Sequence, residues 1–189
     1  MTSMSLGMED TACLLGAYSY IEGRLYEVLG VMAADESLPR AALLLEELSQ
    51  QHAWHASLFA DRVPLVGGLD PAPRRSSIGT TVELALARVA GISHSSERLA
   101  VLSRSVLPRM ATGYRRHLAR ANPTSDGPVI RALRLVVRDE VEAALECEAV
   151  LEECLAGSDP AVALGAVTAI EKLLAPGGPG LVPWPSEPD

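Results

Sequence analysis

Apolar residues recur at alternating spacings of three and four through most of this chain of 189 residues. Such spacing places side chains on one face of an α-helix, whereas a half-buried strand needs a spacing of two. We call each such row of residues an apolar stripe. The first stripe consists of Leu14, Tyr18, Ile21, Leu25, Val28 and Met32. A stripe of this length predicts a long helix that packs against partner helices.

Four long helices are predicted, because stretches rich in Pro, Gly and polar residues interrupt the stripes. The main interruptions are "DESLP" at 35–39, a long connection at 63–77 and "NPTSDGP" at 122–128. The third long helix is expected over 95–121. Pro108 lies in its middle and lacks a backbone N–H, so a kink is expected there.

The pattern as a whole predicts an all-α fold, a four-helix bundle with a crossover connection and an additional C-terminal helix. A short amphipathic helix is expected in the crossover at 78–92, and the additional helix at 160–175. We expect a single helical domain over 10–175, preceded by an arm at 1–9. Residues 176–189 form a Pro/Gly-rich tail that is expected to be extended.

Composition excludes some partners. The formal net charge is −8, which disfavours binding to nucleic acid or to an anionic membrane. No apolar run reaches the ~18 residues of a membrane-spanning helix, and the N-terminus lacks the charge pattern of a signal peptide. We therefore expect a cytoplasmic protein. The three cysteines have no metal-site spacing.

Titratable side chains interrupt the stripes at positions where apolar residues are expected. His52 and His55 belong to the second stripe, and Glu140 belongs to the fourth. Glu22 follows Ile21 on an otherwise apolar edge of the first helix. Burying these groups is costly unless they are paired, hydrogen-bonded or bound to a cation.

These four residues are expected to lie at one height in the bundle. Glu22 precedes residue 36, in the first turn, by 14 residues, and His52 follows it by 16. At ~1.5 Å per residue, the two differ in height by only about 3 Å. His55 shares the face of His52, one turn away. Imidazoles and carboxylates that converge in a bundle are the ligands that a transition metal such as iron needs.

This arrangement resembles the ferritin-like superfamily of di-iron oxygenases and iron-storage proteins over residues 10–156. The family pattern has Glu, Glu-x-x-His, Glu and Glu-x-x-His on four successive helices. Glu22 matches the first position, and His52-x-x-His55 matches the second with His in place of Glu. Glu140 matches the start of the fourth motif, but Ala143 stands where its His is expected.

The third helix departs most from the family pattern, because residues 98–125 contain no Asp or Glu. At most four of the six family ligands are therefore present. The resemblance implies a single metal ion, most simply iron, bound by Glu22, His52, His55 and Glu140. It also implies an oxidoreductase acting on O2 or on a small-molecule substrate, and a homodimer.

A metal-free bundle that acts in association or scaffolding is the alternative. In that case Arg104 or Arg109 would fill the site and pair with the core carboxylates. Trp54, Phe59 and the tail sequence "LVPWP" would be the contact candidates.

Other polar residues were assigned from their positions relative to the stripes. Asp139 lies off its stripe and is expected to be solvated, and His117 is expected at a border position. Tyr18 and Gln51 are the candidate partners for the second ring nitrogens of the two histidines.

Overall fold

The computed structural model describes residues 5–64, 79–155 and 160–185, and within these ranges every regular element is a helix. The all-α prediction is thus confirmed. The elements are α1 (Met8–Ala34), α2 (Pro39–Ala60), α3 (Thr80–Ala90), α4 (Ser95–Val101), the π-helix η2 (Leu102–Val106), α5 (Leu107–Arg120), α6 (Gly127–Leu155), α7 (Pro160–Leu174) and the 3₁₀-helix η3 (Ala175–Gly177). Most of the interruption predicted at 63–77 lies outside the described residues.

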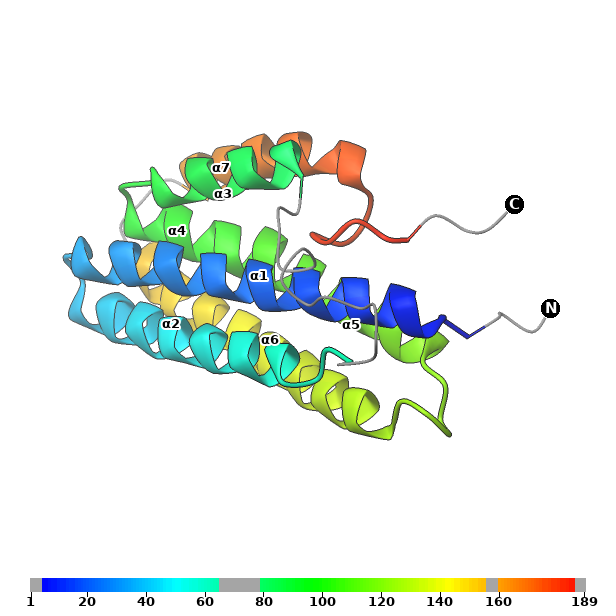
Figure 1. The fold of residues 1–189 in the computed structure, drawn as a ribbon. Coiled ribbons are helices and arrows are strands. Elements are labelled where there is room, and N and C mark those ends of the chain that lie inside the picture. The colour runs from blue at the N-terminus through cyan, green and yellow to red at the C-terminus, as the bar shows by residue number, and fades with distance from the viewer. Residues whose placement is uncertain (1–4, 65–78, 156–159, 186–189) are drawn as a thin grey trace.

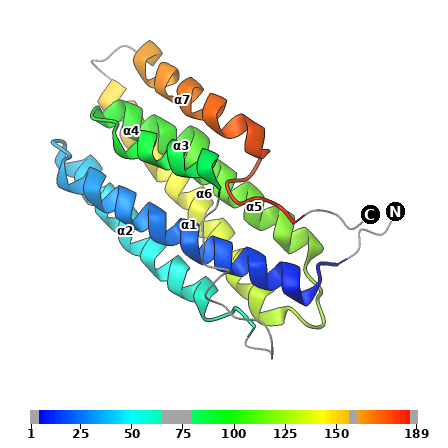
Figure 2. The same cartoon turned by 45° about the horizontal axis from the view of Figure 1, so that its top comes forward.

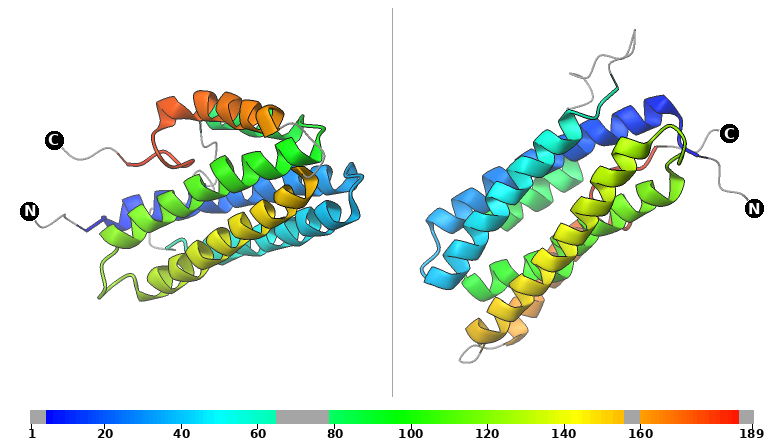
Figure 3. Two further views of the ribbon diagram at one scale, coloured as in Figure 1. Left: turned by 180° about the vertical axis from the view of Figure 1, so that it is seen from behind. Right: turned by 90° about the horizontal axis from the view of Figure 1, so that it is seen from below.

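Four long rods lie side by side: α1, α2, α6 and the continuous rod formed by α4, η2 and α5 (Figures 1 and 3). α1 packs against α2, and α5 packs against α6. Both pairs are antiparallel, because short links join their members. α2 and the α4–α5 rod run in the same direction, so the chain between them must return along the bundle. α3 makes part of this return (Figure 1).

α3 and α7 form a second layer on one side of the rods (Figure 2). α7 packs against α3 and α4, and α3 packs against α1. The chain then turns back along α5, where Leu181 is 3% exposed and Arg116 lies 4.2 Å from the centre of the Trp184 ring. The apolar residues of "LVPWP" that fall in this stretch therefore contact their own chain.

The third long helix was expected to kink at Pro108, but its α-helical hydrogen bonding is interrupted just before that residue. A π-helix occupies residues 102–106, and the Leu107 amide donates to the Leu102 carbonyl. Because Pro108 has no N–H, it cannot supply the α-helical bond to the carbonyl four residues earlier. The π-helical bonding just before it changes the hydrogen-bond partners locally, and the rod then continues as α5.

The predicted stripes form the core. All six residues of the first stripe are at most 5% exposed. On α6, the spacing predicts a buried stripe that includes Leu133, Val137, Ala144, Cys147 and Leu151. Leu133, Cys147 and Leu151 are buried, while the neighbours Val136 and Ala143 are buried more deeply than Val137 and Ala144. None of the helices in the described part of the chain is long and apolar enough to span a membrane.

Candidate metal centre

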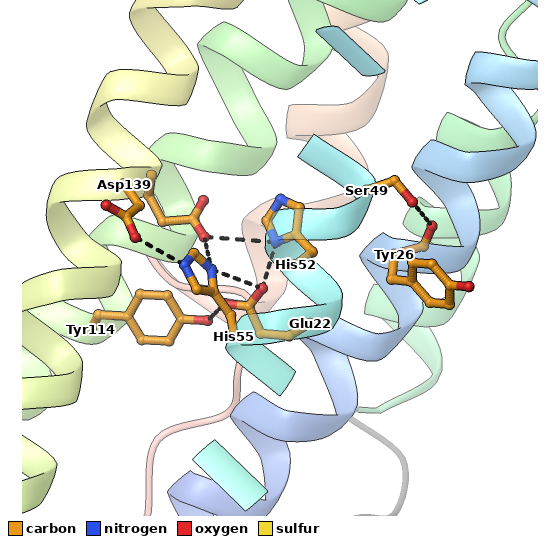
Figure 4. A network of polar contacts seen from close by, with 8 residues as sticks. Glu22, Tyr26, Ser49, His52, His55, Tyr114 and Asp139 are labelled. Atoms are coloured by element: carbon orange, nitrogen blue, oxygen red, sulfur yellow. Dashed lines mark hydrogen bonds and ion pairs between the residues drawn. The ribbon is translucent and has the colours of Figure 1, made fainter. Parts of the chain in front are cut away.

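Glu22, His52, His55 and Glu140 converge at the middle of the bundle (Figure 4). α1 supplies Glu22, α2 supplies both histidines and α6 supplies Glu140. One ligand atom from each residue can be chosen so that all four lie within 4.8 Å of one another. All four residues are at most 1% exposed. The convergence expected from helical spacing is present, and the cluster is compatible with a metal site.

Glu22 makes contacts with both of its carboxylate oxygens. His52 Nδ1 is hydrogen-bonded to Glu22 Oε2, and the Tyr114 hydroxyl donates to Glu22 Oε1 (Figure 4). Tyr114 lies on α5, so all four rods contribute a polar side chain at this height. The spacing of apolar residues in the third long helix predicts an inward position for Tyr114, but no residue pattern indicates that its hydroxyl reaches Glu22.

Glu140 lies close to both imidazoles without bonding to either. Its Oε1 is 3.6 Å from His55 Nδ1 and 3.8 Å from His52 Nδ1. The same His55 nitrogen lies 3.6 Å from Glu22 Oε2. These distances exceed those of ordinary hydrogen bonds but leave the atoms facing a common centre.

The second nitrogen of His55 points away from the cluster and meets Asp139 on α6. The distance from His55 Nε2 to Asp139 Oδ2 is 3.2 Å, and the Asp139 side chain is only 12% exposed. The prediction that Asp139 is solvated was therefore wrong. Asp139 directly precedes Glu140, so it lies beside the buried face of the helix, close enough for its carboxylate to reach His55.

Tyr18 and Gln51 do not serve as the predicted partners of the ring nitrogens. The Tyr18 hydroxyl instead faces the Gly113 carbonyl at 3.5 Å, and His52 Nε2 has no hydrogen-bond partner. An acceptor such as Asp139 holds a ligating imidazole in one orientation and one tautomer.

Among the residues that the structure describes, several buried polar atoms of the cluster have no hydrogen-bond partner. They are His52 Nε2, His55 Nδ1 and both carboxylate oxygens of Glu140. Leaving a buried donor or acceptor unsatisfied costs about 1–3 kcal/mol, so such atoms are rare in folded proteins. Two of them, His55 Nδ1 and Glu140 Oε1, lie 3.6 Å apart and each lies within 3.8 Å of another member of the cluster, so a cation between them would satisfy both.

The cluster also shifts the pKa values of its members. Burial opposes ionisation of Glu22, but the charges of His52 and His55 and the hydrogen bond with His52 outweigh it and lower the pKa to about 2. Burial likewise disfavours a charged His55, yet Glu140 and Glu22 raise its pKa to about 10. The pKa of His52 is raised in the same way. Burial dominates at Glu140 and raises its pKa. The site favours positive charge at its centre.

Among the described residues, no arginine supplies that charge. Arg104 pairs with Glu148, and Arg109 pairs with Glu171 on α7, with Nη2 of Arg109 2.6 Å from Oε2. Both pairs lie away from the cluster, so neither Arg104 nor Arg109 fills the site. In the part of the chain that the structure describes, the contacts of Glu22 and Glu140 are with His and Tyr.

His117 is not at a border, as its arginine neighbours had indicated, but is fully buried. Its ring lies near Tyr18 and Trp184, with centroid distances of 5.7 Å and 6.4 Å. Burial lowers its pKa to about 4, so it is neutral at physiological pH. It does not belong to the Glu/His cluster.

The ligand spacing suits one ion. Nitrogen and oxygen ligands lie about 2.0–2.2 Å from a transition metal, so opposite ligand atoms are separated by up to about 4.4 Å. The 4.8 Å limit of the cluster is close to that value. Two carboxylates also cancel the charge of a divalent ion, which matters in a buried site. The cluster contains no thiolate, and mixed imidazole and carboxylate ligands suit iron, manganese or zinc.

No family model, no curated protein and no solved structure matches this chain. The chemistry of the cluster therefore has to be argued from its own residues.

Proposed function

We propose that this chain is a ferritin-like bundle that binds one iron ion through Glu22, His52, His55 and Glu140 and acts as an oxidoreductase. The observation that carries the proposal is the convergence of four buried ligand atoms within 4.8 Å of one another, in a cluster where His55 Nδ1 and both oxygens of Glu140 have no hydrogen-bond partner among the described residues. The order of the helices supports the ferritin-like part, because two antiparallel pairs are joined by a connection that runs along the bundle. We propose that residues 10–175 form the single domain.

The ligands favour a redox-active ion. Two imidazoles with one or two carboxylates form a set used for ferrous iron in oxygenases, and three protein ligands or more fix the ion firmly. A bound iron ion would supply one-electron chemistry that no side chain of the cluster provides. The chain's own residues bind and orient the ion, and their burial keeps bulk water away from it.

The enclosure of the site restricts the substrate. Glu22, His52, His55 and Glu140 are at most 1% exposed. Burial of this degree disfavours a bulky organic substrate at the centre. O2 is small and uncharged, and it diffuses through side-chain motions that a larger molecule cannot use. We therefore propose O2 as the co-substrate.

Anaerobic loading with ferrous iron tests the metal site. We expect one iron per chain in the natural protein and none in His52→Ala or His55→Ala, measured by metal analysis after removal of free ion. His117→Ala is the matched control, since it removes a buried imidazole outside the cluster and should keep its iron.

Absence of iron from the natural protein would reject the iron site and leave the metal-free scaffold. Two irons per chain would show ligands beyond the four named. Exposure of the loaded protein to O2 tests the reaction, and the absorbance of ferric iron should rise. A protein that binds zinc but leaves ferrous iron unoxidised would keep the site and exclude the oxidoreductase.

We also propose a homodimer formed through the outer face of α1 and α2, as the family resemblance implies. Several large apolar side chains on these helices are more than two-fifths exposed: Tyr26, Val31, Leu43 and Trp54. Apolar and aromatic residues of this kind are enriched at the centres of interfaces. Light scattering at micromolar concentration should give twice the monomer mass, and a mass near 20.0 kDa would contradict the proposal.

A further inference from the structure

The third rod of the bundle lacks a carboxylate but still reaches the metal centre. Residues 98–125 contain no Asp or Glu, yet Tyr114 of α5 donates its hydroxyl hydrogen to Glu22 Oε1. The other oxygen of Glu22 faces His52 and His55 (Figure 4). The two oxygens of one carboxylate thus have different surroundings.

The Tyr114 ring is held firmly by its neighbours. It lies edge-on to Tyr18, with a centroid distance of 4.8 Å, and 5.3 Å from Phe59. All three side chains are at most 1% exposed. The chain has only four tyrosines, two tryptophans and one phenylalanine, so three of its seven aromatic residues pack together here. This packing fixes the position of the Tyr114 hydroxyl.

The hydroxyl meets Glu22 as a hydrogen-bond donor. A carboxylate oxygen only accepts, so the bond between the two oxygens uses the hydrogen of the Tyr114 hydroxyl. The geometry therefore assigns Tyr114 to the support of Glu22.

We propose that Tyr114 is a positioning residue of the metal centre, which occupies Glu22 Oε1 and leaves only Oε2 to bind the ion. The inference rests on the proposed metal site. A carboxylate with both oxygens free can bind one ion through both of them or bridge two ions. Tyr114 blocks both arrangements. The third rod therefore contributes no ligand, but its Tyr114 limits how Glu22 can coordinate the ion.

Cobalt(II) is a suitable probe, because it binds imidazole and carboxylate ligands and its visible absorption reports coordination number. Tyr114→Phe removes one oxygen atom and frees Glu22 Oε1. We expect the cobalt affinity to fall by about 10–100-fold, the usual effect of losing a hydrogen bond that orients a ligand. At saturating cobalt, the visible absorption should weaken as Glu22 binds through both oxygens and the coordination number rises.

Tyr18→Phe is the matched control. Tyr18 is another fully buried tyrosine of the same aromatic group, and its hydroxyl faces only the Gly113 carbonyl at 3.5 Å. This variant should keep both the affinity and the spectrum of the natural protein. Circular dichroism of both variants checks folding. The spectrum at saturation is read from metal-bound protein, so a general loss of stability does not imitate the expected change.

Each outcome decides between the proposals. If the natural protein binds no cobalt and no iron, the metal site is rejected and the role of Tyr114 falls with it. If the natural protein binds and Tyr114→Phe matches it in affinity and spectrum, only the positioning role is rejected. Equal changes in Tyr18→Phe would assign the effect to packing. A charge-transfer band in the ferric protein that disappears in Tyr114→Phe would make Tyr114 a ligand and overturn its role as a donor.

Discussion

Two buried polar clusters lie in this bundle, one at its middle and one near its end, and they differ in how completely their atoms are satisfied. The end cluster consists of Glu36, Ser95 and Arg98. Arg98 donates to the Ile92 carbonyl at 2.7 Å, the Met32 carbonyl at 3.0 Å and Glu36 Oε2 at 3.2 Å. Ser95 donates to Glu36 Oε1.

The central cluster has the same burial but an incomplete set of bonds. Arg98 and Glu36 have side chains 5% and 1% exposed, and their polar atoms are matched within the chain. Glu140 is equally buried, but neither of its oxygens has a hydrogen-bond partner. The hydrogen bonds of the end cluster are complete within the chain, and they join the α1–α2 link to α4. The central cluster becomes complete only when a cation is added, which is the property of a site.

Replacing one carboxylate in each cluster with an amide should give the largest difference in the free energy of unfolding between the two clusters. Glu36→Gln removes one partner of a buried ion pair and leaves Arg98 uncompensated, a change that typically costs about 3–5 kcal/mol. Glu140→Gln loses no hydrogen bond and removes only the charge that lies 3.6 Å from His55 Nδ1, so the free energy of unfolding of the metal-free protein should fall by less than in Glu36→Gln. Denaturant unfolding with a chelator present measures both.

Equal losses in the two variants would contradict this comparison, because Glu140 would then stabilise the fold as Glu36 does. A large loss in Glu140→Gln alone would identify the central cluster as a structural ion pair. Metal addition provides the second half of the test. It should stabilise the natural protein and Glu36→Gln, but not Glu140→Gln.

The pH dependence of the free energy of unfolding tests whether the charge of Glu36 stabilises the end cluster. Burial acts to raise the pKa of Glu36, but hydrogen bonds from Ser95, the Leu38 amide and Arg98 outweigh it and hold the pKa below 4.5. A carboxyl whose pKa is lower in the folded state stabilises the fold above its unfolded pKa, and this stabilisation is lost as the pH falls.

The stability difference between the natural protein and Glu36→Gln should therefore be constant above about pH 5 and shrink as the pH falls below 4.5. Denaturant titrations of both proteins across this range measure it. A difference that stays constant through the acid range would show that the Gln substitution acts through packing and not through charge.

Helical spacing alone was enough to predict the convergence of the four central residues. Their positions depend on the rise and the turn per residue of an α-helix, which are nearly the same in every sequence. The estimate of similar height for Glu22 and His52 agrees with the hydrogen bond between them. The all-α class was predictable for the same reason, since an apolar stripe identifies the buried face of each rod.

Contacts between side chains on different rods were not predictable in this way. Asp139 was assigned to solvent because it lies one position off the stripe, yet a side chain at the edge of a buried face can turn inward when it finds a partner. Arg104 and Arg109 were candidates for the site because of their height. Arg104 lies within the π-helix and Arg109 follows it, and the two pair with Glu148 and Glu171. A π-helix changes the register of all following residues, and no residue pattern announced it.

Asp139 is expected to have the smallest effect of the residues that distinguish the two clusters. It is hydrogen-bonded to the candidate ligand His55 but is not itself a member of the central cluster. Its carboxylate accepts from His55 Nε2, which directs His55 Nδ1 to the cluster centre. Asp139→Asn keeps the shape and an acceptor oxygen but removes the charge that makes the imidazole a stronger ligand. We expect metal affinity to fall by about 10–100-fold, or about 1.4–2.7 kcal/mol of binding free energy.

Competition with a chelator of known affinity measures the change in Asp139→Asn. Glu146→Gln is the matched control, because it also removes one negative charge from α6, but at an exposed position outside the cluster. A long-range effect of net charge would weaken binding equally in both variants, whereas orientation of His55 predicts a loss in Asp139→Asn alone. If both variants bind as tightly as the natural protein, the bond to Asp139 serves only the packing of α2 against α6. The central cluster would then hold its ion without support from Asp139.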